Sequence, residues 1–166
     1  YYVPFYLTDR SASAIAQNCT KLESFSFVDS DITTSGLQSV IANNPKITTL
    51  NLSKNDSLGD DTVDVIARYL PRLKELRNYW ANETRWLTDD DLISLINAQE
   101  KQNGNVCLNL IGLYREENLT IRGLEYAIKK GLKVIEMDKD TYKKVGKLES
   151  EYDVNFWQAK YIHYMD

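Results

Sequence analysis

A short apolar motif that returns about every 25 residues constrains the fold of this chain more than any other feature. Residues 47–55 read L-x-x-L-x-L-x-x-N, with Ile47 in the first position and Asn55 in the last. Copies of the motif begin near residues 22, 47, 73, 105 and 132, and Asn78 replaces the third apolar residue in the third copy. A fixed period of this length predicts stacked structural units that share one continuous core.

The second half of each unit has helical spacing. Val63, Ile66 and Leu70, for example, recur at i, i+3 and i+7, which places them on one face of a helix. Residues with good N-capping side chains stand just ahead of four such runs: Thr33, Asp60, Thr88 and Thr120. Each unit is therefore predicted to be a short strand followed by a helix, with neighbouring strands paired in parallel.

The motif and its period are those of leucine-rich repeats. Residues 7–22 and 32–47 further resemble the cysteine-containing subtype found in the substrate-receptor half of F-box proteins, with Cys19 at the end of the first helical run and Asn44 at the same place in the next unit. The resemblance implies an α/β leucine-rich-repeat solenoid, a short curved horseshoe with parallel strands on the concave face and helices on the convex face. It implies about five repeats in a domain over residues 1–140.

The tail, residues 141–166, leaves the repeat pattern. Its apolar and aromatic side chains still recur at helical steps of three and four, which predicts a C-terminal segment that caps the exposed core edge of the last repeat. The alternative is an aromatic anchor that docks on another subunit.

Strand residues that point away from the core form the predicted partner-binding face. The repeat register predicts a central ladder of Ser26, Asn51, Arg77, Asn109 and Glu136. On one side of it lie Val28, Ser53, Tyr79, Ile111 and Asp138, and on the other Ser24, Thr49, Glu75, Cys107 and Val134. From these ladders we predict that Ser26, Asn51, Ser53, Arg77, Tyr79, Asn109, Glu136 and Asp138 contact a protein partner; the alternative is a solvated strand face.

The fourth unit is longer than its neighbours, and the excess falls in residues 78–86. This insertion carries Tyr79, Trp80, Arg85 and Trp86, which are residue types that dominate binding hot spots. Because insertions map to loops and loops carry function, these four residues are also predicted to bind a partner. The alternative is that the two tryptophans fold back as a lid over the strand ends.

Composition narrows the class of partner. The net charge of −4 argues against a nucleic-acid binder, and no apolar run approaches the length of a membrane span. We therefore expect protein partners of unknown identity, contacted either by a free F-box/LRR-like adaptor or by a permanent subunit of a large assembly. Size and repeat type also resemble the mitochondrial coupling factor B group, so a mitochondrial location is the alternative to the cytoplasm.

Two cysteines make no disulfide framework and favour a reducing, intracellular compartment. Five N-x-S/T sequons, more than chance supplies, keep secretion as an alternative. Their asparagines are Asn18, Asn51, Asn55, Asn82 and Asn118.

No enzyme is predicted. The single histidine, His163, is not placed beside Cys107 by any spacing, and no catalytic motif is present. The acidic run 89–91 stands at a predicted helix start, where carboxylates cap amides and favour the helix dipole, so we expect capping and no metal or other cofactor.

Overall fold

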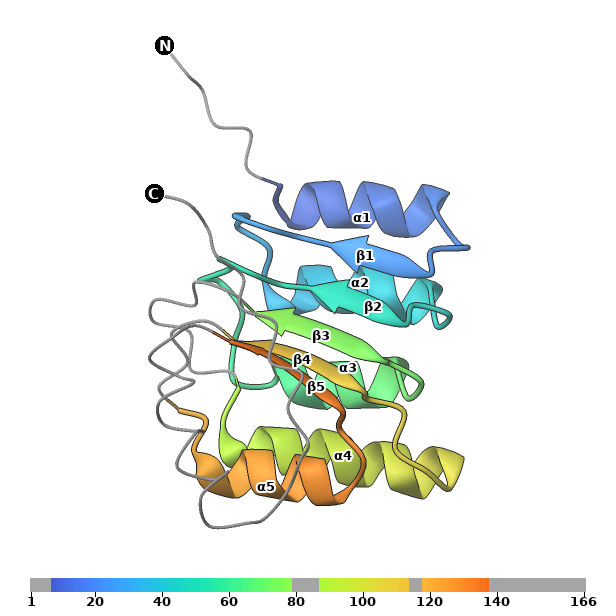
Figure 1. Cartoon of the computed structure of the whole chain (residues 1–166). Helices are drawn as coiled ribbons and strands as arrows, with labels where there is room; N and C mark the ends of the chain where they lie inside the picture. Colours follow the sequence, from blue (N-terminus) through green and yellow to red (C-terminus); the bar gives the residue numbers. More distant parts are fainter. Residues whose placement is uncertain (1–6, 79–86, 114–117, 138–166) are drawn as a thin grey trace.

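Strands and helices alternate along the chain, as the repeat predicts. The computed structural model describes residues 7–78, 87–113 and 118–137 (Figure 1). The helices are α1 (Asp9–Asn18), α2 (Thr34–Asn43), α3 (Thr62–Tyr69), α4 (Asp89–Asn103) and α5 (Ile121–Lys129). The strands are β1 (Ser24–Ser26), β2 (Thr49–Asn51), β3 (Glu75–Asn78), β4 (Leu110–Leu113) and β5 (Val134–Met137).

These five strands form one parallel sheet in chain order, β1-β2-β3-β4-β5. The helices lie on one side of this sheet and each packs mainly against its sequence neighbours (Figure 1). The prediction of an α/β fold with parallel strands is therefore confirmed, and the arrangement is consistent with a leucine-rich-repeat-like fold.

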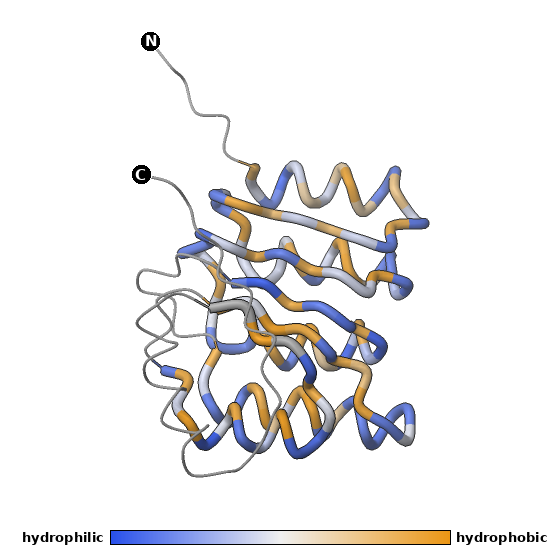
Figure 2. Tube along the Cα trace, viewed as in Figure 1, coloured by the Kyte–Doolittle hydropathy of each residue, from blue (hydrophilic) through white to orange (hydrophobic). Residues whose placement is uncertain are grey.

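The core forms because the motif puts one apolar residue at the same place in each strand. The middle position aligns Phe25, Leu50, Leu76, Ile111 and Ile135 across the sheet. The last four of these are buried against the helices, together with the apolar faces of α2 to α5. Figure 2 shows the resulting alternation of hydrophobic and hydrophilic positions along the strands and helices.

The predicted register of the fourth unit is wrong by three residues. The copy begins at Leu108, and Ile111 and Leu113 fill the next two apolar positions, all three being buried. Helix α4 runs through Asn103, and Gly104 ends it with a left-handed φ of 74°, so the chain needs residues 105–107 to reach the strand. The sequence 105–113 fits the motif in two registers, and only the burial of the side chains decides between them.

Buried amide side chains tie two of the turns to the unit before them. Asn44, at the cysteine position of the motif, donates to the carbonyl of Cys19 (2.8 Å) and accepts from the N–H of Leu22 (3.0 Å). In the fourth unit Gln99 donates to the carbonyl of Leu73 and accepts from the N–H of Leu108. These amides satisfy turn groups that no strand or helix pairs, because a buried backbone group without a partner is costly.

Asn55, the closing residue of the motif, is also buried. Its Nδ2 donates to the carbonyls of Phe27 (2.6 Å) and Leu52 (2.8 Å), and the hydroxyl of Ser30 donates to its Oδ1. Because this amide nitrogen is buried and donates hydrogen bonds to two carbonyls, a glycan on Asn55 is incompatible with the folded unit.

The helix starts follow the predicted caps with one shift. Thr33, Thr88 and Thr120 are the N-caps of α2, α4 and α5, and each side chain accepts a hydrogen bond from the first turn. The N-cap of α3 is Asp61, one residue after the predicted Asp60.

Candidate protein-binding surface

The sheet face that the helices leave uncovered carries two of the three predicted ladders, each with one substitution. Gly112 replaces Asn109 in the central row, and Leu110 replaces Cys107 in the row that contains Glu75. The backbone pairing aligns Ser26, Asn51, Arg77, Gly112 and Glu136. We call this row, together with the row Ser24, Thr49, Glu75, Leu110 and Val134, the open sheet face.

Two charged side chains on the open sheet face pair with each other. Arg77 donates from Nη1 to Glu75 Oε2 at 2.7 Å, an ion pair between alternate residues of β3. Both side chains are only partly exposed, at 24% and 35%, which limits their freedom to rotate. Because Ser26 and Asn51 occupy the same row, β1 to β3 present a polar strip with one organised charge pair.

Besides Cys107, which lies ahead of β4, three predicted positions are corrected by the structure. Ser53 is buried and donates its hydroxyl to Asn51 Oδ1 at 2.5 Å, because the strand ends at Asn51 and the chain turns at Lys54, whose φ is 56°. Ile111 is buried in the core, and Asn109 is exposed ahead of β4, out of line with Arg77. The corrections at Ile111 and Asn109 both result from the shifted register of the fourth unit.

Other predicted contact residues lie outside the described residues. These are Tyr79, Trp80, Arg85 and Trp86 of the insertion, Asp138, and the whole tail 141–166. For Glu136 the structure gives its place in β5, opposite Gly112. Val28 is exposed, but it lies beyond the end of β1.

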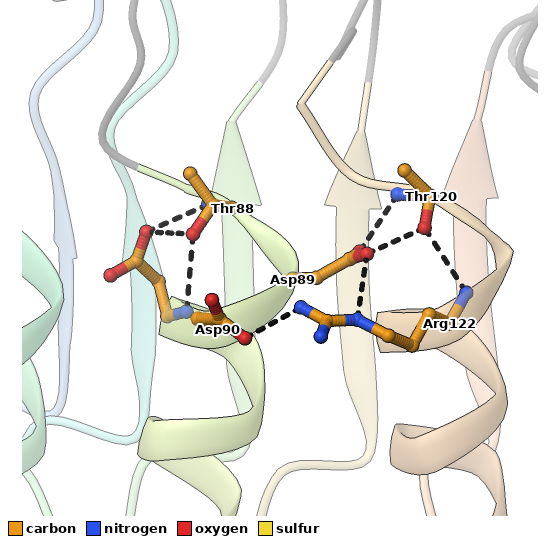
Figure 3. Close-up of polar contacts among 6 residues, drawn as sticks. Thr88, Asp89, Asp90, Thr120 and Arg122 are labelled. Carbon is orange, nitrogen blue, oxygen red and sulfur yellow. Dashed lines mark hydrogen bonds and ion pairs between the residues drawn. The ribbon is translucent and has the colours of Figure 1, made fainter.

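A second polar cluster joins the starts of α4 and α5 (Figure 3). Thr120 donates its N–H to Asp89 Oδ1 (2.8 Å) and its hydroxyl to Asp89 Oδ2 (2.5 Å). Arg122 lies between two carboxylates, with Nε 3.4 Å from Asp89 and Nη2 2.5 Å from Asp90. The sequence signal for this cluster was the acidic run, whose cross-unit partner was missed because it lies 31 residues further along the chain.

The three aspartates of the run thus have three different environments. Asp91 forms the capping box with Thr88, as predicted, accepting its N–H at 2.8 Å and its hydroxyl at 2.6 Å. Asp90 is exposed beside Arg122, and Asp89 is buried. Among the described residues no group of three or more His, Cys, Asp or Glu side chains is arranged to hold a metal ion.

Hydrogen bonding decides the pKa of Asp89. Burial alone raises the pKa of this carboxyl, but the hydroxyl and N–H of Thr120, the side chain of Arg122 and the N–H of Gly123 together outweigh burial and hold the pKa below its ordinary value. The pKa of Arg122 is raised, first by its hydrogen bond to Asp90. The charged form of Asp89 is therefore the form that the fold stabilises.

The same arrangement recurs at the start of the chain. Asp9, the first residue of α1, accepts the N–H of Thr33 (2.9 Å) and its hydroxyl (2.7 Å), and Thr33 caps α2. In both places a glycine stands three residues after the threonine, Gly36 or Gly123, and a Cβ there would collide with the aspartate carboxylate. The first residue of one helix thus holds the N-cap threonine of the next helix, which ties neighbouring units together.

Comparison with known families agrees with the repeat analysis. A family model described as Leucine Rich repeat matches residues 43–67, which run from the end of α2 through β2 into α3. The match supports a leucine-rich-repeat protein, a class of typically non-catalytic modules that bind other proteins. No curated protein matches the chain. Within the described part of the chain, no helix is long and apolar enough to cross a membrane.

Proposed function

We propose that this chain is a leucine-rich-repeat solenoid that recognises a protein partner through its open sheet face. The observation that carries the proposal is the row Ser26, Asn51 and Arg77, set in register by three parallel strands and backed by a buried apolar row. A backbone fixed by strand pairing avoids the cost of ordering a loop on binding, which favours recognition. In this proposal the chain is not an enzyme.

The aromatic insertion extends the proposed surface. Residues 79–86 connect β3 to α4, so this segment begins directly after Asn78, the neighbour of Arg77 in β3. Tyr79, Trp80 and Trp86 would supply the aromatic anchors that the polar strip lacks, and Arg85 would add a further residue of a type common in binding hot spots. Glu136 and Asp138 would extend the surface toward β5.

Within this function we propose a free intracellular adaptor of the F-box/LRR-like kind, with residues 1–140 as the repeat domain and 141–166 as its cap. The second candidate is a permanent subunit of a larger assembly, similar to the coupling factor B group, with the tail as a docking anchor. The observation that favours this candidate is the aromatic character of residues 141–166, which include Tyr152, Phe156, Trp157, Tyr161 and Tyr164.

Affinity capture of the endogenous full-length protein, followed by mass spectrometry and sizing, tests the function. Arg77→Ala should reduce recovery of the main partner, whereas Arg10→Ala, on the exposed start of α1, should leave it unchanged. Equal recovery with both variants would remove the open sheet face from the proposal. A stoichiometric large complex would select the subunit, and a monomer with substoichiometric partners would select the adaptor.

A further inference from the structure

The two edges of the sheet at which the strands begin and end carry opposite charge. In the described turns that lead from a helix into the next strand there are six cations and one carboxylate, Glu23. The six cations, which we call the basic edge, are Lys21, Lys46, Arg72, Lys74, Lys130 and Lys133. The described turns that lead from a strand into the next helix instead hold Asp29, Asp31, Asp56, Asp60 and Asp61 against Lys54.

The basic edge is continuous over the first three units, because each contributes a cation at the same place. The turn of the fourth unit, residues 104–109, holds no cation and separates these residues from Lys130 and Lys133. Lys21, Lys46 and Arg72 each precede the first apolar residue of a repeat motif, and parallel strands lie about 4.8 Å apart. In Figure 1 these turns all lie along the right-hand edge, and Figure 2 shows hydrophilic positions there. Five of the six side chains belong to exposed residues, Lys130 being half-buried.

Within the described part of the chain, carboxylates leave most of this charge uncompensated. Lys130 pairs with Glu100 at 2.6 Å, while Lys21, Lys46, Arg72, Lys74 and Lys133 form no ion pair with any described residue. Like charges in one row repel one another and oppose folding. The acidic edge lies a helix length away, about 12–22 Å for helices of 8–15 residues, which exceeds the Debye length of about 8 Å at physiological salt.

Helix ends do not account for the row. Cations stabilise a helix when they lie in or next to its last turn, and the effect falls off beyond it. Lys21, Lys46 and Arg72 each lie three residues past the last residue of their helix. Their charge is therefore available to something outside the chain.

We propose that the basic edge docks an acidic, Asp- and Glu-rich segment of a partner protein, at a site separate from the open sheet face. Charge complementarity selects the ligand, and the composition of the edge selects a protein over other polyanions. The described turns of this edge contain no aromatic residue on which bases could stack, and five of the six cations are lysines, which lack the fork that arginine offers to phosphate. Exposed large apolar residues that could enter a membrane, Leu7, Val28 and Ile121, lie among the described residues at the opposite edge.

The test is a titration of a fluorescent ten-residue polyglutamate peptide with the full chain. Fluorescence anisotropy measures the affinity at low and at physiological salt. Lys46→Gln and Lys74→Gln should each weaken the binding by roughly two- to five-fold, the range of one exposed ion pair. Arg10→Gln removes the same charge from an exposed position at the far edge and should leave the affinity unchanged. Arg77→Ala should also leave it unchanged, which separates this site from the proposed sheet-face function.

Three results would overturn the proposal. One is equal affinity of wild type, Lys46→Gln and Lys74→Gln for the peptide. Another is binding of a ten-residue oligouridylate, or of vesicles with 30% phosphatidylserine, as tight as that of the peptide, which would assign the edge to nucleic acid or to lipid. The third is a concentration-dependent dimer that Lys46→Gln dissolves, which would assign the edge to a second copy of the chain.

Stability distinguishes docking from a structural role. If the cations serve a partner, Lys46→Gln and Lys74→Gln should leave the melting temperature unchanged or raise it, because repulsion within the row is relieved. A lowered melting temperature in both variants would mean that the lysines serve the fold, and the proposal would fail.

Discussion

Asp89, the first residue of α4, accepts hydrogen bonds from both the N–H and the hydroxyl of Thr120, the residue that caps α5. This contact joins the ends of two long connections, 79–88 and 114–120, because each leads into one of the two helices. A single buried carboxylate therefore fixes where both connections return to the fold.

Removing that carboxylate should destabilise the protein. Asp89→Ala leaves Thr120 without its acceptor, so we expect a loss of about 2–3 kcal/mol in the free energy of unfolding, the cost typical of a charge-assisted hydrogen bond in a buried site. Asp90→Ala is the matched control, because its partner Arg122 is exposed and the pair is screened. Urea unfolding of both variants measures the difference; equal losses would contradict the role of Asp89.

Acid should weaken the same contact. The folded-state pKa of Asp89 lies below its unfolded value, so the carboxylate contributes its full stability above the unfolded pKa of about 3.9. That contribution is lost as the pH falls through the lower, folded pKa. Asp89→Asn should be less stable than wild type at pH 7, with the two curves converging below pH ~4. A stability difference between wild type and Asp89→Asn that stays constant down to pH ~2 would show that the folded-state pKa of Asp89 is not lowered.

Gly123 should resist a substitution that usually helps a helix. Glycine to alanine inside a helix normally gains up to about 1 kcal/mol. Here a Cβ would lie 2.5 Å from Asp89 Oδ1, so Gly123→Ala should instead cost about 1–3 kcal/mol by displacing the carboxylate.

A double-mutant cycle identifies the cause of that cost. The penalty of Gly123→Ala should shrink in the Asp89→Ala background, where the colliding oxygen is gone, and an unchanged penalty would place the strain elsewhere. Gly36→Ala, which faces Asp9 in the same way, provides an independent repeat of the experiment.

Burial of Ile111 can be checked directly against exposure of Asn109. Ile111→Ala should cost about 2–5 kcal/mol because it opens a cavity in the core, whereas Asn109→Ala should change stability by less than about 0.5 kcal/mol. Denaturant midpoints of the two variants decide between the registers. A larger loss of stability for Asn109→Ala than for Ile111→Ala would contradict the register in which Ile111 is buried.

The sequence predicts the fold well where the motif is unambiguous. Leu50 and Leu76 each stand in a motif with one readable register, and their strands pair as expected. In the fourth unit Leu108, Leu110, Ile111 and Leu113 satisfy two registers, and the choice depends on where α4 ends. Local spacing cannot distinguish the two registers, because the choice depends on which side chains are buried when the strands pair.

The candidate site is less predictable than the fold. Ser26 and Arg77 could be placed on the open sheet face because strand alternation is a local rule. Ser53 could not, since the strand stops two residues earlier and the alternation ends with it. The hydrogen bonds from Thr120 to Asp89 link residues 31 apart, and no periodic signal in the chain connects them.

Each strand pairs only with its sequence neighbours, in the order β1 to β5, so each described unit is stabilised mainly by the units next to it. Energy lost at one interface is not shared by distant units, so opening can begin at either end and halt between two repeats. With the Asp89–Thr120 contact broken, the units ending at α4 and the unit containing α5 should exchange their amide hydrogens at separate rates. One carboxylate would then determine whether the protein unfolds as a single cooperative block or as two.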